Sequence, residues 1–152
     1  MHQKELIEEE LTKSVIGAFF DVYNTLGYGF MESLYVRALQ EELRGRGHFV
    51  AREFSLRVVY NGVDIGTQRL DMVVDGKIVI EVKSTEHLHP SAIRQVYSYL
   101  RGTGLEVGLL LHFGPQPKFY RQIWKTDRSR LTGKNQKRET GSNSFDPVDP
   151  FS

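Results

Sequence analysis

The segment KIVIEVK, residues 77–83, decides the fold because it is an apolar strand with two charged residues near its end. Apolar residues alternate at Ile78, Ile80 and Val82, which is the two-residue period of a β-strand. Glu81 and Lys83 therefore share the opposite face, roughly 6.6 Å apart along the strand. A carboxylate and an amine in this position form either an ion pair on a solvated sheet face or part of a chemical site.

A meander of strands is predicted around this segment, because apolar, β-branched and aromatic residues alternate through it. Asn61-Gly62 and Asp75-Gly76 predict two-residue hairpin turns, since these residue types tolerate positive φ. The expected strands cover residues 49–54, 56–60, 63–74 and 77–83.

The second turn brings another carboxylate to the charged face. If this turn has two residues, Val74 pairs with Lys77 and Asp71 with Ile80. Asp71 then lies diagonally next to Glu81, within reach of a shared ion. Two carboxylates this close repel each other unless a cation lies between them. Mg²⁺ fits, because it takes hard oxygen ligands and often uses only one or two carboxylates.

Helices flank the predicted strands. Residues 5–26 and 32–46 each show apolar positions three and four apart, the pattern of an amphipathic helix. Gly27 and Gly45 come at their ends, where glycine tolerates the backbone turn. The elements expected downstream are a helix at residues 91–101, a strand at 105–113 that is buried on both faces, and an edge strand at 118–124. This order predicts a single-domain α/β fold with a mixed sheet.

Composition narrows the classes of protein. The 152 residues are 39% hydrophobic and 26% charged, as in a globular domain with a core of its own. The chain has no cysteine, which excludes a disulfide scaffold, a thiolate zinc site and a cysteine nucleophile. No apolar run is long enough for a signal sequence or a membrane span, so the expected location is the cytoplasm and no membrane partner is expected.

The last part of the chain differs from the rest. Residues 125–152 show no periodicity and are rich in Gly, Ser, Asn, Pro and charge, which predicts a disordered tail after a domain at residues 1–124. Residues 125–138 carry six basic residues against one acid, although the net charge of the chain is only +1. Such a run is either a solvated tail or a non-specific contact for nucleic-acid phosphates.

Several motifs in order resemble a known family. Gly29, Glu32 and Tyr35 have the spacing GxxExxY, and nine residues separate Asp71 from Glu81-Val82-Lys83. A helix with Gln95 and Tyr99 and a strand ending Leu111-His112-Phe113-Gly114 come next. Over about residues 6–124 the chain is similar to the GxxExxY proteins of the PD-(D/E)XK nuclease superfamily. His112 stands where the family usually has asparagine.

The resemblance implies a restriction-endonuclease-like core, a mixed sheet flanked by helices in the order αβββαβ. It implies hydrolysis of phosphodiester bonds in DNA, with RNA less favoured, assisted by Mg²⁺ or Mn²⁺. Asp71, Glu81 and the backbone carbonyl of Val82 would bind the ion, and Glu32 would complete the acidic cluster. Lys83 would position the attacking water and stabilise developing charge.

Other residues of these motifs have two interpretations. Glu32 either supports the ion or only opens a helix, where a carboxylate is favoured by the dipole. Gln95 and Tyr99 share a helix face that either reaches the metal's waters and the substrate or packs on the sheet. Arg69 shares the face of Asp71 and could pair with Glu81 or meet a phosphate. Tyr35 is expected in the core and Gly29 in a turn.

The remaining polar residues give weak signals. His87 and His89 are two apart, as in some zinc sites, but spacing suggests no third ligand. His112, on an apolar strand, is expected to be a core histidine, and no Ser-His-Asp arrangement stands out.

Two functions from other classes compete with the nuclease. One is a binding module that keeps the fold without turnover, and the other is a structural protein whose acidic cluster is an ion-pair network. A domain this small could also need a homodimer or a protein partner for specificity.

Overall fold

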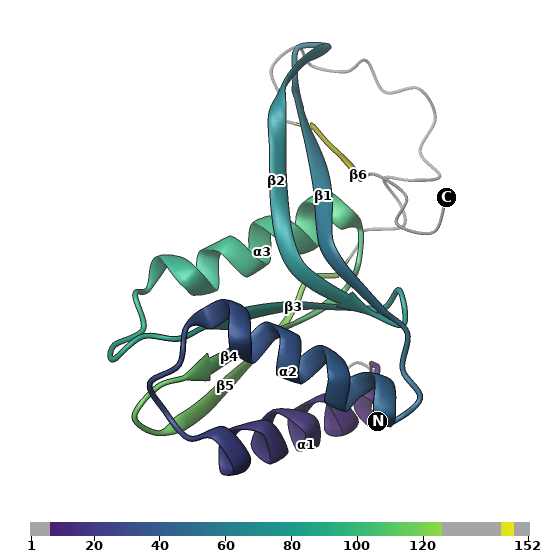
Figure 1. Ribbon diagram of the computed structural model, residues 1–152. Coiled ribbons are helices and arrows are strands. Elements are labelled where there is room, and N and C mark those ends of the chain that lie inside the picture. The colour runs from purple at the N-terminus through teal and green to yellow at the C-terminus, as the bar shows by residue number, and fades with distance from the viewer. Residues whose placement is uncertain (1–6, 126–143, 148–152) are drawn as a thin grey trace.

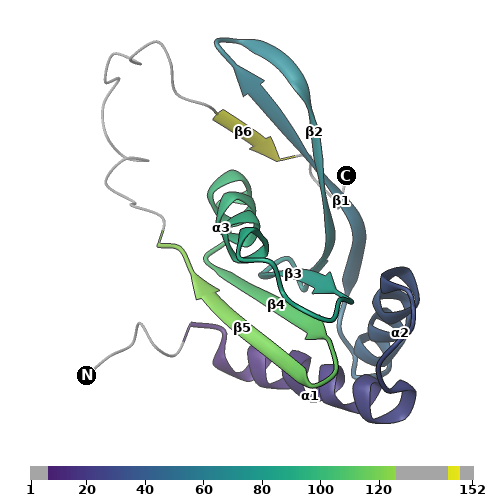
Figure 2. The ribbon, with the colours of Figure 1, turned by 90° about the vertical axis from the view of Figure 1, so that its left-hand side faces the viewer.

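A six-stranded sheet organises the molecule, with the strand order β5-β4-β3-β2-β1-β6. The computed structural model describes residues 7–125 and 144–147, and only the backbone of the second segment. The elements in chain order are α1 (Glu9–Leu26), α2 (Glu32–Gly45), β1 (Val50–Tyr60), β2 (Val63–Val74), β3 (Ile78–Lys83), α3 (Ser91–Thr103), β4 (Val107–Phe113), β5 (Pro117–Ile123) and β6 (Ser144–Pro147). Helices α1 and α2 cover one face of the sheet and α3 covers the other (Figures 1 and 2).

The sheet is mixed, as the sequence predicts. Strands β3 and β4 are parallel and joined through α3, whereas the other neighbouring strands are antiparallel. All of β4 is buried, which confirms the prediction that this strand has no solvated face. Helix α3 packs directly on β4, because a Cβ at Gly108 would lie 2.6 Å from Cγ1 of Val96. The restriction-endonuclease-like α/β architecture is therefore confirmed.

Each face of the sheet has its own apolar core. On the α1–α2 face, Phe19 and Leu39 pack with residues such as Met72 and Ile80. On the α3 face, the partners of Val79 are residues from α3, β1 and β2. Val79, Glu81 and Lys83 share a face in the strand alternation, so the charged face of β3 is directed toward α3 and its core.

The long β1–β2 hairpin passes from one face to the other, curving past α3 (Figure 2). Val50 and Met72 belong to the core on the α1–α2 face, whereas Phe54 and Leu70 belong to the core on the α3 face. Glu53, at the crossing point, has a φ of 53°, which marks a local irregularity in β1. Pairing of β2 with β3 stops at Met72, one residue after Asp71.

The predicted register between these two strands is wrong by one residue. Val74 pairs with Ile78, not with Lys77, because the turn holds three residues between the paired positions. Lys77 N donates to Val74 O at 3.0 Å within this turn. Extended by one step, the observed register sets Asp71 level with Glu81, closer than the predicted diagonal.

Other boundaries shift little. The two strands expected at residues 49–54 and 56–60 are one continuous strand, β1, and α3 continues to Thr103.

The expected disordered tail includes a strand, since β6 pairs antiparallel with β1 from Leu56 to Val59. The basic run from Arg128 to Arg138 lies outside the described residues. Of the helices that the structure describes, none is long and apolar enough to cross a membrane.

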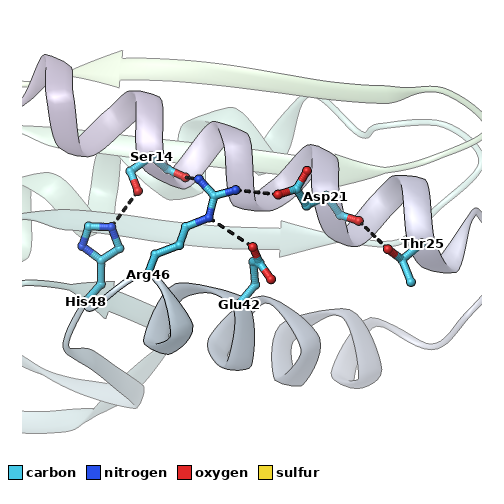
Figure 3. A network of polar contacts seen from close by, with 6 residues as sticks. All are labelled: Ser14, Asp21, Thr25, Glu42, Arg46 and His48. Carbon is cyan, nitrogen blue, oxygen red and sulfur yellow. Dashed lines mark hydrogen bonds and ion pairs between the residues drawn. The ribbon is translucent and has the colours of Figure 1, made fainter.

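A network of polar contacts joins α1 to α2 and to His48 (Figure 3), and His48 also contacts the β2–β3 turn. The guanidinium of Arg46 donates to Asp21 Oδ2 at 2.6 Å, to Glu42 Oε1 at 3.1 Å and to Ser14 O at 3.3 Å. His48 Nε2 lies 2.7 Å from Ser14 Oγ. His48 Nδ1 lies 2.8 Å from Oδ2 of Asp75, a residue of the β2–β3 turn. This α1–α2 clamp consists of Ser14, Asp21, Glu42, Arg46, His48 and Asp75.

Candidate active site at the end of β3

The predicted site residues gather around the end of β3. The α1–α2, β3–α3 and β4–β5 connections come together at this end of the molecule, on the left in Figure 1. Their ends are tied to each other, since Ser84 Oγ donates to Phe30 O at 2.8 Å and Tyr23 OH donates to Gly114 O at 2.7 Å. The site is therefore built on loops that are fixed to the sheet.

Asp71 lies where β2 leaves β3. The backbone N–H of Val82 donates to Asp71 Oδ2 at 2.7 Å. The carboxylate thus replaces the β2 backbone carbonyl that would accept this hydrogen bond if the pairing of β2 with β3 continued. Burial raises the pKa of Asp71, while this hydrogen bond and the charge of Lys83 act to lower it. The strand divergence thus leaves Asp71 between the sheet and solvent.

Glu81 is the most unusual charged group of the site. It is 5% exposed, and its Oε2 is buried without a hydrogen-bond partner. Its Oε1 lies 3.4 Å from Lys83 Nζ. Burial, and next the charge of Asp71, raise the pKa of Glu81 to about 8. A buried carboxylate oxygen without a partner is costly, so it is a natural position for a ligand.

Glu32 is held at this site by its own motif. Tyr35 OH donates to Gly27 O and accepts a hydrogen bond from Phe30 N at 3.2 Å, which fixes the loop before α2. Gly29 has a φ of 119°, so its assignment to a turn is confirmed, and the fully buried Tyr35 is a core residue, as predicted. Glu32 opens α2 and lies near Asp71 and Lys83, so its position is compatible with either interpretation, and a role at an ion stays a prediction.

The environment of Glu32 supports this position. Burial raises its pKa first, and the charge of Asp71 also acts to raise it. The charge of Lys83 and a hydrogen bond from the backbone of Ser84 act in the opposite direction. The charge of Lys83, whose side chain is 27% exposed, thus acts to lower the pKa of all three carboxylates.

Gln95, Tyr99 and Arg69 form a group on the α3 side. Tyr99 OH donates to the backbone carbonyl of Arg69 at 3.3 Å, and Gln95 hydrogen-bonds to the Tyr99 side chain. Tyr99 is 1% exposed, so it packs in the core and does not face a substrate directly. Burial, then the charges of Glu81 and Asp71, raise the pKa of Tyr99, which places its ring beside the acidic pair. Arg69 is exposed, and Glu81 pairs with Lys83 instead of with it.

A cleft of about 220 Å³ adjoins Asp71. Its lining residues are Glu32, Ser33, Val36, Arg52, Glu53, Arg69, Leu70 and Asp71. Arg52 is a residue that the sequence analysis missed, and its charge acts to lower the pKa of Asp71. Arg52 Nη1 donates to Gln40 at 2.9 Å, while its Nε is buried without a partner. The only signal in the sequence was an arginine within an otherwise strand-like stretch.

A divalent ion fits the donor set at Asp71 and Glu81. The charge of Asp71 lies close enough to raise the pKa of Glu81, and Glu81 Oε2 is buried without a hydrogen-bond partner. Across residues 7–125, no three side chains of the His, Cys, Asp or Glu type are arranged to hold an ion together. The fit is therefore to a site with two carboxylates, of the kind in which Mg²⁺ keeps several waters.

The histidines have structural partners. His112 is 4% exposed, and its Nε2 donates to Thr85 O at 2.8 Å, which confirms a core histidine, although its Nδ1 is buried without a partner. His89 Nδ1 accepts a hydrogen bond from Ser91 N at 3.1 Å and so caps the start of α3. The zinc interpretation of His87 and His89 gains no third ligand among the described residues.

The structure does contain a Ser-His-Asp arrangement, which the sequence did not reveal. Ser14, His48 and Asp75 of the clamp are linked at 2.7 and 2.8 Å. Ser14 lies inside α1, where neighbouring backbone N–H groups are used in helical hydrogen bonds and cannot stabilise an oxyanion. Asp75 Oδ1 also accepts the N–H of Phe49 at 2.8 Å. The arrangement therefore joins three elements of the fold.

Sequence comparison agrees with this geometry. The family model of the PD-(D/E)XK nuclease superfamily matches residues 9–124, which hold all the site residues described above. The chain belongs to the PD-(D/E)XK nuclease superfamily. Nucleases of this superfamily generally use divalent metals, and membership implies nucleic acid as the class of substrate.

Structural comparison supports the same fold. The chain is similar to the crystal structure of SSO0001, with a TM-score of 0.51 and 21% sequence identity. The similarity covers 85% of this chain, which spans only 66% of the other protein's length. At this identity the likeness concerns the fold alone. No curated protein has a sequence similar enough to count as a relative.

Proposed function

We propose that this protein is a metal-dependent nuclease that hydrolyses phosphodiester bonds, and that Asp71 and Glu81 bind its divalent ion. The observation that carries the proposal is the buried, unpartnered Oε2 of Glu81 beside a second carboxylate. Such an arrangement is unfavourable without a cation and becomes favourable when one binds. Mg²⁺ is the expected ion and Mn²⁺ the alternative, since both prefer oxygen ligands.

The backbone of Val82 is the third proposed ligand. Its N–H donates to Asp71, and the N–H and C=O of a strand residue point to the same side. The carbonyl of Val82 is therefore directed toward the same carboxylate. When bound there, the ion would polarise the phosphate and lower the pKa of a bound water.

Lys83 is proposed to hold the attacking water and to stabilise negative charge on the phosphate. Its amine already lies 3.4 Å from Glu81, and its side chain is partly exposed. A preorganised cation in a partly buried site stabilises a developing charge more strongly than solvent does. Lys83 is thus a catalytic residue in this proposal and not a metal ligand.

The remaining residues have supporting roles in the proposal. Glu32 would orient waters of the ion from the start of α2, and Gln95 would do so from the α3 side, where it hydrogen-bonds to Tyr99. Arg69 would contact a substrate phosphate, since it is exposed and lines the cleft next to Asp71. Tyr99 would act by positioning, because its hydroxyl holds the backbone of Arg69.

We further propose that the chain is a GxxExxY protein and that DNA is its substrate, with RNA the less favoured nucleic acid. The contacts of Tyr35 with Gly27 and Phe30 support this assignment, since they fix the loop before α2 and so hold Glu32 in position. The alternative is a binding module that retains the nuclease fold. The intact set of Asp71, Glu81 and Lys83 favours the enzyme.

A cleavage assay tests the proposal. Labelled single-stranded, duplex and branched DNA, and RNA of the same sequence, are incubated with the protein and Mg²⁺, Mn²⁺ or EDTA. Cleavage with either metal, absent in EDTA and in Asp71→Asn, is expected. Binding of nucleic acid without cleavage under every condition would support the binding module instead.

A further inference from the structure

Apolar side chains are exposed along the α1–α2 loop and the first turn of α2. Tyr28, Phe30, Met31 and Leu34 are 45%, 46%, 72% and 48% exposed. These four residues are called the apolar rim. Single exposed hydrophobic residues are common, but four within seven positions of one loop indicate a contact surface.

The apolar rim is fixed beside the acidic site. Phe30 O accepts the hydroxyl of Ser84, the residue after β3, and Phe30 N donates to Tyr35 OH. The ring of Phe30 also meets that of Tyr35 edge-on, with centroids 6.0 Å apart. Glu32 lies within the same stretch of chain and faces Asp71 and Lys83. A ligand on the rim therefore also lies next to the carboxylates.

The charges around the rim indicate which ligand fits it. Arg52 and Arg69 line the cleft next to Asp71, and Lys83 lies at the end of β3. The cleft also holds the carboxylates of Glu32, Glu53 and Asp71. Exposed aromatic side chains near the three cations match a chain with flat bases and a phosphate backbone. A continuous duplex matches less well, because its bases are stacked inside and present only their edges.

We propose that the apolar rim binds unpaired bases of a nucleic-acid strand whose phosphates enter the cleft beside Asp71. The preferred substrate then has a single-stranded segment at or near the cleaved bond. This inference rests on the proposed function and specifies the substrate of the same site.

Binding without metal tests the rim separately from cleavage. A fluorescent oligothymidine of about twelve nucleotides and a blunt duplex of the same length are titrated in EDTA, with fluorescence anisotropy as the readout. Tyr28→Ala should weaken binding of the single strand about tenfold or more and leave duplex binding nearly unchanged. The matched control is Tyr60→Ala, because Tyr60 is also 45% exposed but lies at the far end of the β1–β2 hairpin.

Phe30 variants separate stacking from simple bulk. Phe30→Trp should keep the affinity for oligothymidine, whereas Phe30→Leu should lower it several-fold, since leucine has no aromatic face. Thermal melting of each variant shows whether the loop contact with Tyr35 has been lost. Tyr28→Ala remains decisive, because the loop contacts with Tyr35 described above are made by Phe30.

Equal affinities in Tyr28→Ala and Tyr60→Ala would overturn the inference. So would a wild-type dimer that Tyr28→Ala converts to a monomer on gel filtration, since the rim would then bind a second copy. If rim variants lose single-strand binding but no metal supports cleavage, the rim is confirmed and the nuclease proposal fails. If Asp71→Asn abolishes cleavage while rim variants bind normally, the nuclease proposal stands and the rim inference fails.

Discussion

The α1–α2 clamp and the acidic site are both clusters of charged side chains, and they differ in whether the charges are paired. In the clamp, Arg46 lies between Asp21 and Glu42, and His48 bridges Ser14 to the β2–β3 turn. In the acidic site, the charge of Lys83 acts on three carboxylates, those of Asp71, Glu81 and Glu32. Each carboxylate of the clamp has a hydrogen-bond or ion-pair partner within the cluster, whereas Oε2 of Glu81 in the acidic site is buried without one.

The difference assigns a role to each cluster. Paired and hydrogen-bonded charges hold elements of a fold together without further partners. Buried carboxylates with raised pKa values are unfavourable when ionised, and a bound cation or a proton relieves this, which is typical of functional sites. Changes in the acidic site should therefore affect activity, and changes in the clamp should affect stability.

The largest expected effect is the loss of cleavage on removing a proposed metal ligand. Asp71→Ala and Glu81→Ala should each abolish metal-dependent cleavage, because each removes an oxygen that the ion needs. Glu42→Ala, a charge removed from the clamp, is the matched control and should cleave at nearly the wild-type rate. Full activity in either ligand variant would show that the ion binds elsewhere.

Lys83→Ala should reduce the cleavage rate while leaving metal affinity nearly intact. A loss of about a hundredfold or more is expected for removing a preorganised group that stabilises developing charge. Rates at saturating substrate and Mn²⁺ titration by calorimetry measure the two effects separately. A collapse of Mn²⁺ binding would instead assign Lys83 a role in holding Glu81 in place.

The stability of the metal-free protein should depend on pH through Glu81. Burial and the charge of Asp71 raise the pKa of Glu81 to about 8, against an ordinary glutamate value of 4.5. The folded state keeps a proton that the unfolded chain releases, so stability should fall as the pH rises from about 4.5 to about 8, by up to a few kcal/mol. Thermal melts in EDTA should show this fall in the wild type and a flatter profile in Glu81→Gln. Parallel profiles would mean that Glu81 titrates normally.

The smallest effects are expected in the clamp. His48→Ala should lower the free energy of unfolding by about 1–2 kcal/mol, because it leaves Ser14 and Asp75 without their shared partner. Arg46→Ala should cost less, up to about 1 kcal/mol, since its ion-pair partners are partly solvated. Urea unfolding gives both values. A loss of cleavage in His48→Ala without a loss of stability would give the Ser-His-Asp arrangement a chemical role.

Much of the fold could be predicted because the local signals are strong. Alternation around Ile78, Ile80 and Val82 defined β3, and Asn61-Gly62 and Asp75-Gly76 marked both hairpin turns. The register across the second turn failed, because Val74 pairs with Ile78 and Lys77 stays in the loop, although the Lys77 N–H still donates to Val74 O. Strand β6 was missed, since its pairing with β1 depends on a contact distant in sequence.

The site was predictable as far as its motifs reached. The spacing of Asp71, Glu81 and Lys83 follows from strand geometry, and the structure brings all three together. Arg52 and the partners of His48 could not be found from sequence, because they depend on how β1 crosses the sheet and how α1 packs on α2. Long-range packing leaves no periodic trace in the chain.

The most direct test of the contrast between the two clusters is Mn²⁺ binding to three proteins, measured by isothermal titration calorimetry. The proteins are the wild type, Glu81→Gln and Glu42→Gln, so one carboxylate is neutralised in the acidic site and one in the clamp. Mn²⁺ should bind to the wild type and Glu42→Gln with similar affinity, and binding to Glu81→Gln should be weakened severely or lost. Equal binding by all three proteins, or no binding by the wild type, would contradict the assignment of the acidic site.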